Sequence, residues 1–356
     1  MSSPSTPTLA PTEHDVSRIE KFWLGHDHGR VMVTVTPLEL RGGLQRAGIE
    51  ERFAAHAAHL PRMAELPGTN VPSVYPDYGP ISNALYWGCV DTHAGEVENP
   101  HVDPAAASIE DALELTPRPV DDPELHAAEG LELFRRLQRH FDTEDLWLRT
   151  PDAQGVLTTA GMIVDQQELL MGMVAEPEET TRFLDRVCDW LLELWNYVRE
   201  QSGHRVCGTI WPHTFLPEQL GFAITEDMMP LLSPELYETF GIPQLRKIEN
   251  ALGPLHIHCC GQWGRHAENL AASGVRFRGL EFHYPFTRIE ELAPLADKAV
   301  FVPYLSMDQQ SEFADVASYY HHLLENTPKE NRYWFPLIGD DAETLQLARS
   351  LIAAGQ

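Results

Sequence analysis

The chain has 356 residues, and 53 acidic residues against 26 basic ones give it a formal net charge of −27. This balance argues against nucleic acid or an anionic membrane surface as a partner, because both are bound through basic surfaces. The length allows one large domain or two ordinary ones. The five cysteines are odd in number, and Cys259 and Cys260 are adjacent. This is unlike a secreted disulfide framework and predicts reduced thiols in a cytoplasmic protein.

The N-terminal segment is rich in Ser, Pro and Thr and lacks a basic stretch followed by an apolar one. We therefore expect residues 1–15 to be a disordered tail rather than a signal peptide. The sequence contains no run of about 18 apolar residues, so no membrane span is expected. Residues 16–356 are predicted to form one domain.

Short β-branched and aromatic runs alternate with longer amphipathic segments, which is typical of a parallel sheet covered by helices. One clear helical pattern covers Pro177–Glu200, and another begins at Ser233 and ends near Leu252, before Gly253 and Pro254. Eight runs predict a single (β/α)8 barrel of the triosephosphate isomerase type. These runs are Val31–Thr36, Val71–Pro76, Leu146–Pro151, Cys207–His213, Leu255–Cys260, Gly279–Tyr284, Val300–Leu305 and Tyr333–Ile338.

The alternative is an open, doubly wound sheet. Its nucleotide-binding version has no support, since no G-x-G-x-x-G turn follows an early strand. The long Pro- and Asp-rich stretch Tyr78–Pro123 predicts an elaborated N-terminal excursion that covers the mouth of the barrel.

The predicted strand from Leu255 to Cys260 carries the strongest chemical signal. Alternation places His256, His258 and Cys260 on one face, and the apolar face suits the helix layer. His258 and Cys260 lie about 6.6 Å apart at Cα, close enough to share one ion, whereas His256 lies one layer deeper. An imidazole and a thiolate at the carboxyl end of a barrel strand favour a zinc site.

The next predicted strand adds two further candidate metal ligands. Glu281 and His283 share a face and would stand beside His258 and Cys260, so either can supply a third ligand. A buried histidine pair hydrogen-bonded to a glutamate, with ordinary core cysteines, explains the same pattern without a metal.

Four other segments contain candidate catalytic or substrate-binding residues. Trp211 and His213 end a predicted strand, where they could stack on a substrate and exchange protons with it. The alternative is that Trp211 is a packed aromatic residue and His213 a capping residue. Glu226 and Asp227 are adjacent carboxylates before a helix, suited to proton transfer or an ammonium contact, or to helix capping. Further substrate-binding candidates are Tyr75, Asp77 and Tyr304, although Asp77 before Gly79 also fits a simple turn.

Six short segments in chain order carry a recognisable pattern: Leu148–Gly155, Asp165-Gln166, Glu176–Glu178, Thr225–Asp227, Leu232–Glu235 and His258-Cys259-Cys260-Gly261. They resemble the uroporphyrinogen decarboxylase superfamily, in particular its zinc-dependent methyltransferases that act on methylated corrinoid proteins and thiols such as coenzyme M, and the last segment matches the family's H-x-C-G. The likeness is good from about Leu146 to Glu281 and loose elsewhere. The resemblance implies a barrel in which His258 and Cys260 bind a metal that activates a substrate thiol. Dimers are common in this family.

Two departures from the family pattern matter. The Arg-rich motif that holds the carboxylates of a porphyrinogen is absent from the stretch Thr36–Gly43, which argues against haem synthesis. The further ligand Cys after the last strand is also absent, because that stretch reads Pro336–Asp341. Glu281, His283 or a terminal Asp would have to replace it, or the site does not hold zinc in the usual way.

The sequence leaves three functions open. The first is a zinc-dependent methyltransferase that moves a methyl group from a small methylated donor, or from a corrinoid carried by a partner protein, to a thiol. The second is a decarboxylase-like lyase acting on a small or tetrapyrrole carboxylate, with Arg149 and Arg41 as its cation clamp. The third is a non-catalytic barrel that binds a corrinoid protein.

Overall fold

The computed structural model describes residues 9, 13–26, 29–37, 40, 44–63, 65–92, 101–208, 214–306 and 309–355. The α-helices are α1 Glu13–Trp23, α2 Ile49–Met63, α3 Ser82–Tyr86, α4 Ile109–Glu114, α5 His126–Phe141, α6 Val156–Val164, α7 Gln166–Ala175, α8 Pro177–Gln201, α9 Pro234–Leu236, α10 Ile242–Leu252, α11 Ala267–Ala272, α12 Val316–Asn326 and α13 Ala342–Ala354. A π-helix, η5 Tyr237–Gly241, joins α9 to α10, and short 3-10 helices are η3 Glu218–Leu220, η4 Met229–Leu231, η6 Gly264–His266 and η7 Ile289–Leu295.

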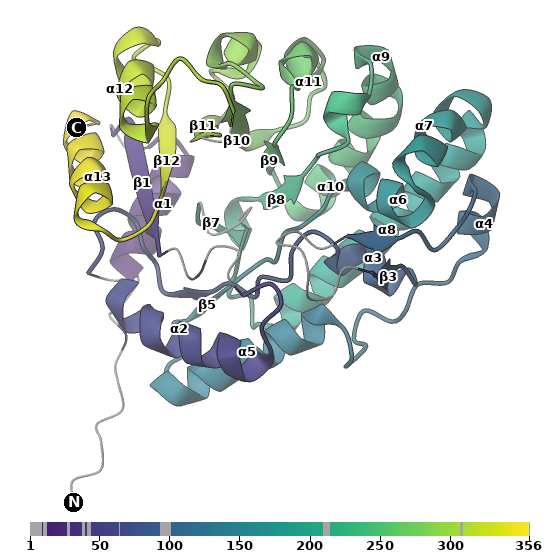
Figure 1. The fold of residues 1–356 in the computed structure, drawn as a ribbon, viewed down its shortest axis with the longest axis horizontal. Coiled ribbons are helices and arrows are strands. Elements are labelled where there is room, and N and C mark those ends of the chain that lie inside the picture. Colours follow the sequence, from purple (N-terminus) through teal and green to yellow (C-terminus); the bar gives the residue numbers. More distant parts are fainter. Residues whose placement is uncertain are drawn as a thin grey trace, which may run out of the picture.

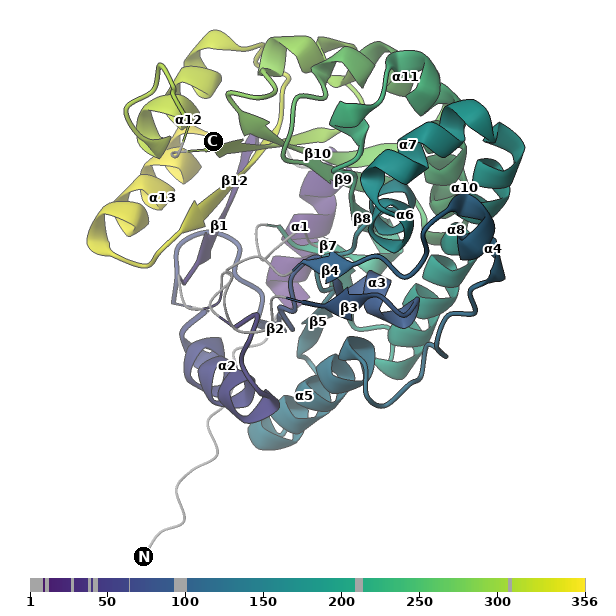
Figure 2. The same cartoon turned by 45° about the vertical axis from the view of Figure 1, so that its right-hand side comes forward.

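The strands are β1 Val31–Thr36, β2 Ser73–Val74, β3 Val90–Asp91, β4 Val102–Asp103, β5 Trp147–Arg149, β6 Val206–Gly208, β7 Leu216–Pro217, β8 Phe222–Thr225, β9 Leu255–Cys259, β10 Phe277–Tyr284, β11 Val300–Leu305 and β12 Tyr333–Ile338. A central parallel sheet has the order β1-β12-β11-β10-β9-β8. Helices lie along its outer side (Figures 1 and 2).

A second sheet has the order β2-β5-β6-β7, in which only β6 and β7 pair antiparallel. Backbone contacts join the two sheets at both edges. At one edge Gln154, just after β5, forms a parallel bridge with Thr225 of β8. At the other, the amide of Thr69, just before β2, donates to the carbonyl of Val33 in β1 at 2.7 Å. The described strands therefore form two linked sheets rather than one continuous sheet.

The strands separate two apolar cores. The larger one lies between strands and helices and includes Leu255, Ile257 and Cys259 of β9. The smaller one collects side chains from both sheets and from α1, among them Trp23, Trp147 and Trp334. Trp23 stacks on Trp334 with ring centroids 5.0 Å apart, so α1 packs against one end of this inner core. The alternation expected for β9 is thus observed, with the apolar residues facing helices.

The sequence predicted most elements, but two of its boundaries differ from the structure. The predicted helix at Pro177–Glu200 is α8, which has Pro at its start and acidic residues in its first turn. The expected tail at residues 1–15 is too long, because α1 begins at Glu13 and Ile19, Phe22 and Trp23 are buried against the inner core. The strand predicted at Cys207–His213 is β6, Val206–Gly208, and residues 209–213 lie outside the described part.

The sequence interpretation also missed β8, Phe222–Thr225, which is the direct neighbour of β9. Its four residues are all buried, and the preceding Gly221 has a φ of +150° with its α-carbon hydrogens against the carbonyl of Pro254. Such a short apolar run has no periodicity that separates it from a loop. No helix in the described part of the chain is long and apolar enough to cross a membrane.

Candidate metal centre and its cavity

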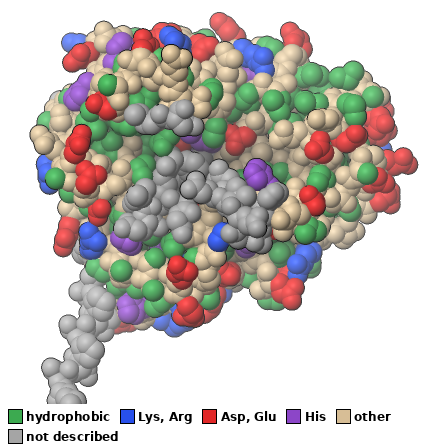
Figure 3. Space-filling view, viewed as in Figure 1, with side chains coloured by type: hydrophobic (Ala, Val, Ile, Leu, Met, Phe, Trp, Pro, Cys, Tyr) green, Lys and Arg blue, Asp and Glu red, His purple; other side chains and the backbone are tan. Residues whose placement is uncertain are grey.

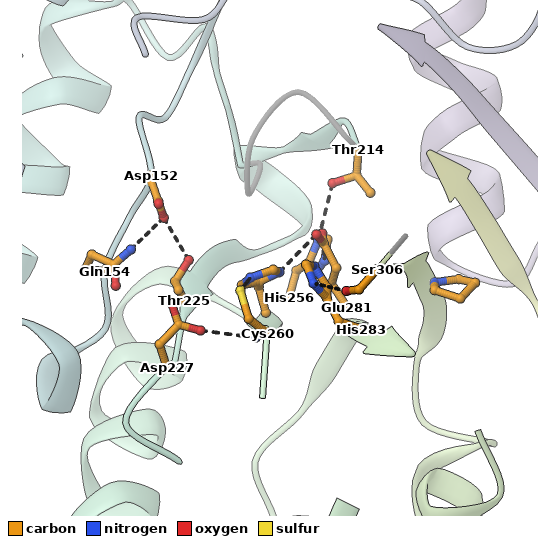
Figure 4. A network of polar contacts seen from close by, with 12 residues as sticks. Asp152, Gln154, Thr214, Thr225, Asp227, His256, Cys260, Glu281, His283 and Ser306 are labelled. Atoms are coloured by element: carbon orange, nitrogen blue, oxygen red, sulfur yellow. Dashed lines mark hydrogen bonds and ion pairs between the residues drawn. The ribbon is translucent and has the colours of Figure 1, made fainter. Parts of the chain in front are cut away.

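His258, Cys260 and His283 bring three potential metal-binding atoms within 4.8 Å of one another. His258 lies in β9, Cys260 directly follows it, and His283 lies in β10 beside it. His258 Nε2 is 3.0 Å from Cys260 Sγ, and the two histidine rings pack edge to face with centroids 5.1 Å apart. We call these three residues the metal wall, of which Figure 4 labels Cys260 and His283. Of the third ligands that the sequence left open, namely Glu281, His283 and a terminal Asp, the structure brings His283 into this cluster.

Glu281 lies behind the metal wall instead of within it. It pairs in register with His258 across the β9–β10 ladder, and its side chain is fully buried. Its Oε1 accepts from His258 Nδ1 at 3.0 Å, and its Oε2 lies 3.5 Å from His256 Nε2. This contact leaves His258 Nε2 directed toward Cys260. Metal-binding histidines commonly have such a carboxylate on the second ring nitrogen.

The charges around His258 favour its protonated form when no metal is present. Burial lowers its pKa, but the negative charges of Cys260 and Glu281, with hydrogen bonds to both, raise the pKa well above 6.5 overall. Burial also raises the pKa of the Cys260 thiol, and His258 opposes this effect. A cation bound between the two would replace the proton they share.

The residues present fit zinc. Two imidazoles and a thiolate are ligands that zinc prefers at about 2.0–2.3 Å, and three protein ligands with an open fourth position are typical of catalytic zinc. Cys260 and His258 also line an open cavity, so the fourth position can face a substrate. Asp340 and Asp341, the terminal Asp alternatives, are engaged elsewhere: Asp340 pairs with Arg62 and Asp341 caps α13.

Opposite the metal wall lies a group of four residues that we call the carboxylate wall: Asp152, Gln154, Thr225 and Asp227 (Figure 4). Asp152 Oδ1 accepts from Gln154 Nε2 at 2.8 Å and from Thr225 Oγ1 at 2.9 Å. Asp227 Oδ1 accepts from the amide of Cys260 at 3.1 Å, which ties this wall to the metal wall. Burial, followed by the charge of Asp227, raises the pKa of Asp152 to about 7.

The two walls border one cavity of about 510 Å³. Residues of the excursion after Tyr78 form part of its lining, as the sequence led us to expect. The described lining residues are Pro80, Ile81, His101, Val102, Pro104, Asp152, Gln154, Thr158, Gly161, Met162, Asp165, Gln166, Thr225, Asp227, His258 and Cys260.

The two adjacent carboxylates singled out in the sequence have different surroundings. Asp227 lines the cavity, whereas Glu226 is only 2% exposed and is absent from the lining. Glu226 packs against Gly155, where an added Cβ would lie 1.9 Å from its Oε1. Burial and the charge of Asp227 raise the pKa of Glu226 to about 8. Asp227 is therefore the one placed to contact a substrate.

The predicted substrate-binding residues lie outside the described lining of the cavity. Arg149 is buried, with its Nε donating to Ser73 Oγ at 2.6 Å, so it links β5 to β2. Tyr75 and Asp77 are also buried, and Asp77 Oδ1 accepts from the amide of Gly79 at 3.1 Å, which is the turn expected as the alternative. The Tyr304 ring packs on His283 with centroids 4.6 Å apart.

The predicted residues Trp211, His213 and Arg41 lie outside the described residues. In contrast, the sequence interpretation gave no role to Asp152, Gln154 and Thr225. One signal was available, since Asp152 and Gln154 follow a predicted strand at the end where barrel sites form. Their convergence with Thr225 could not be seen, because β8 itself was missed.

No protein-family model matches the sequence, and no curated protein is similar to it. The chain does share the fold of a methyltransferase. This solved structure, from Methanosarcina mazei, aligns with a TM-score of 0.65 and 16% identity over 95% of this chain and 97% of that chain. A vitamin-B12-independent methionine synthase candidate from Listeria monocytogenes covers 100% of this chain and 98% of its own, with 13% identity and a TM-score of only 0.41. The likeness to methyltransferases expected from the sequence is thus confirmed at the level of the fold.

Proposed function

We propose that the two linked sheets close into a single (β/α)8-type barrel with the cavity at its mouth. Three observations support this proposal. Backbone contacts join the sheets at both edges. The inner core collects side chains from both sheets. The metal wall and the carboxylate wall come from the carboxyl ends of β5, β8, β9 and β10, which is where barrel enzymes place their sites.

We further propose that the protein is a zinc-dependent methyltransferase that transfers a methyl group to a small thiol. The observation that carries this proposal is the convergence of His258, Cys260 and His283 beside an open cavity. The resemblance of the sequence to corrinoid-dependent methyltransferases and the fold shared with the Methanosarcina enzyme agree with it. The methyl donor would be a small methylated compound or a corrinoid on a partner protein.

The residues of the chain have separate tasks in this proposal. His258, Cys260 and His283 would hold the zinc, which when bound lowers the pKa of a substrate thiol so that it reacts as a thiolate at neutral pH. Glu281 orients His258 through Nδ1. Asp227 holds the Cys260 backbone and faces the cavity, where it can contact substrate.

The decarboxylase alternative gains no support from the cavity. That reaction was expected to use Arg149 in a cation clamp, but Arg149 is bound to Ser73 and to the Thr214 carbonyl and is absent from the cavity lining. The described lining residues include no Lys or Arg. A substrate with several carboxylates would therefore find no Lys or Arg among the described lining residues.

Metal analysis of two cysteine variants tests the proposal. We expect the purified protein to contain about one zinc ion per chain, as a three-ligand site requires. Cys260→Ala should contain no zinc. It should also fail to catalyse methyl transfer from free methylcobalamin to 2-mercaptoethanol, a reaction that yields a thioether and cob(I)alamin. Cys259→Ala is the matched control, because this adjacent thiol is buried on the opposite, helix-facing side of β9.

Zinc-free protein that transfers methyl at full rate would contradict the proposal. So would equal zinc contents in the two variants. Stoichiometric zinc without turnover, combined with retained binding of a corrinoid protein by Cys260→Ala, would favour the non-catalytic alternative.

A further inference from the structure

The carboxylate wall contains a buried acceptor that has no donor. Gln154 is 2% exposed and lines the cavity, and its Nε2 donates to Asp152 Oδ1 at 2.8 Å. This bond fixes the orientation of the amide, because a carboxylate oxygen accepts and the amide nitrogen must donate. Gln154 Oε1 is then left without a hydrogen-bond partner within the described structure. Buried acceptors in folded proteins are normally paired, so this oxygen indicates a donor that arrives with a ligand.

Away from the metal wall, the carboxylates that line the cavity have no Lys or Arg beside them in the described lining. These carboxylates are Asp152, Asp165 and Asp227. Acidic side chains are also scattered over the face seen in Figure 3, in keeping with the net charge of −27. A cation entering this cavity would be attracted, and an anion would be repelled.

We infer that the substrate of this site carries a protonated amine, which donates hydrogen bonds to Gln154 Oε1 and the Asp152 carboxylate. The inference rests on the proposed function, because the same molecule would place its thiol at the metal wall. Asp152 and Cys260 line one cavity, so one substrate molecule can face both walls. A quaternary ammonium fits less well, since it has no N–H to donate. A sulfonate or carboxylate has no hydrogen to donate to Gln154 Oε1 and would be repelled by the Asp152 carboxylate.

Three thiols that differ only in their second group test this inference on the zinc-loaded protein. The probes are cysteamine, 2-mercaptoethanol and 2-mercaptoethanesulfonate, and the measurement is isothermal titration calorimetry. We expect cysteamine to bind about 10- to 100-fold more tightly than 2-mercaptoethanol, the range for a hydrogen bond to a charged group. The sulfonate should bind most weakly. Equal or tighter binding of 2-mercaptoethanol or the sulfonate would overturn the inference.

Two aspartate variants locate the amine. Asp152→Asn keeps an oxygen that accepts from Thr225 and Gln154 but removes the charge, and it should abolish the preference for cysteamine. Asp165→Asn is the matched control, because Asp165 also lines the cavity but is exposed and caps α7 through the amide of Gln167. It should keep the preference. A preference retained by Asp152→Asn, or lost equally in both variants, would overturn the assignment to Asp152.

Ethylamine separates this inference from the proposed function. It has the amine but no thiol, so its binding to chelator-treated protein, followed by saturation-transfer NMR, requires no zinc. If the zinc proposal fails, ethylamine should still bind the wild-type protein and not Asp152→Asn. If the protein binds zinc but ethylamine does not bind, the amine inference alone is wrong.

Discussion

The two walls of the cavity are built in different ways. The metal wall comes mainly from within two adjacent strands, where the β9–β10 ladder pairs His258 with Glu281 and fixes the spacing to His283. The carboxylate wall comes from the segment after β5 and from the end of β8 with the residues after it, and these two strands belong to different sheets. Side-chain hydrogen bonds and the contact of the Gly155 amide with the Thr225 carbonyl at 2.7 Å hold it together. The position of the metal wall therefore follows from one sheet, and that of the carboxylate wall from a junction between two.

A substitution at the junction should disturb one wall and spare the other. An alanine Cβ at Gly155 would lie 1.9 Å from Glu226 Oε1 and 3.0 Å from the Thr225 carbonyl. We expect Gly155→Ala to lower the free energy of unfolding by about 1–3 kcal/mol, the usual effect of overpacking. Zinc content should stay unchanged, because β9 and β10 do not contain this contact. Urea unfolding and metal analysis measure the two effects.

Gly48→Ala is the control for this prediction, since nothing lies within 4 Å of the added Cβ. Its unfolding free energy should stay close to that of the wild type. Loss of zinc from folded Gly155→Ala would show that the position of the metal wall also depends on the junction between the two sheets.

The complementary substitution is Glu281→Gln, which changes the hydrogen-bond partner of the metal-wall residue His258. The charge that holds His258 Nδ1 disappears, while Asp152, Thr225 and Asp227 are untouched. We expect the affinity for zinc to fall about 10- to 100-fold, as is typical when the outer partner of a metal-binding histidine is lost. Competition with a chromophoric chelator measures this. Glu249→Gln is the control, because Glu249 is also buried but pairs with Arg276 away from the site. An affinity for zinc that is unchanged in both variants would contradict the role of Glu281.

The same difference explains which residues the sequence could predict. Strand alternation is a local rule, so the shared face of His258 and Cys260 and the nearby Glu281 and His283 could be read from two short runs. Alternation could not decide whether Glu281 or His283 joins the cluster. That depends on the register of β10, which places Glu281 directly beside His258.

The carboxylate wall has no local rule of this kind. Asp152 and Thr225 are 73 residues apart, and their hydrogen bond depends on β8 lying next to the end of β5. β8 is four residues long and entirely buried, so it has no alternation of polar and apolar residues by which to recognise a strand. Arg149 was misjudged for a related reason. A buried arginine that links two strands cannot be told from a substrate clamp without its partners.

The smallest expected effect concerns the pH dependence of stability at Asp152. Its folded pKa of about 7 exceeds the ordinary value of 3.8, so between these pH values the folded protein binds more protons than the unfolded chain. Stability contributed by this group is present below about pH 4 and is lost as pH rises toward 7. Asp152→Asn mimics the neutral form, so relative to wild type it should gain stability between pH 4 and pH 8 in urea unfolding of chelator-treated protein. The free energy of unfolding of the variant will still fall as pH rises, because burial also raises the pKa of Glu226 to about 8. The control is Asp165→Asn, which changes an exposed carboxylate of the same cavity and should show no comparable gain in stability. If the free energies of unfolding of Asp152→Asn and wild type changed with pH in parallel, Asp152 would be ionised throughout this range.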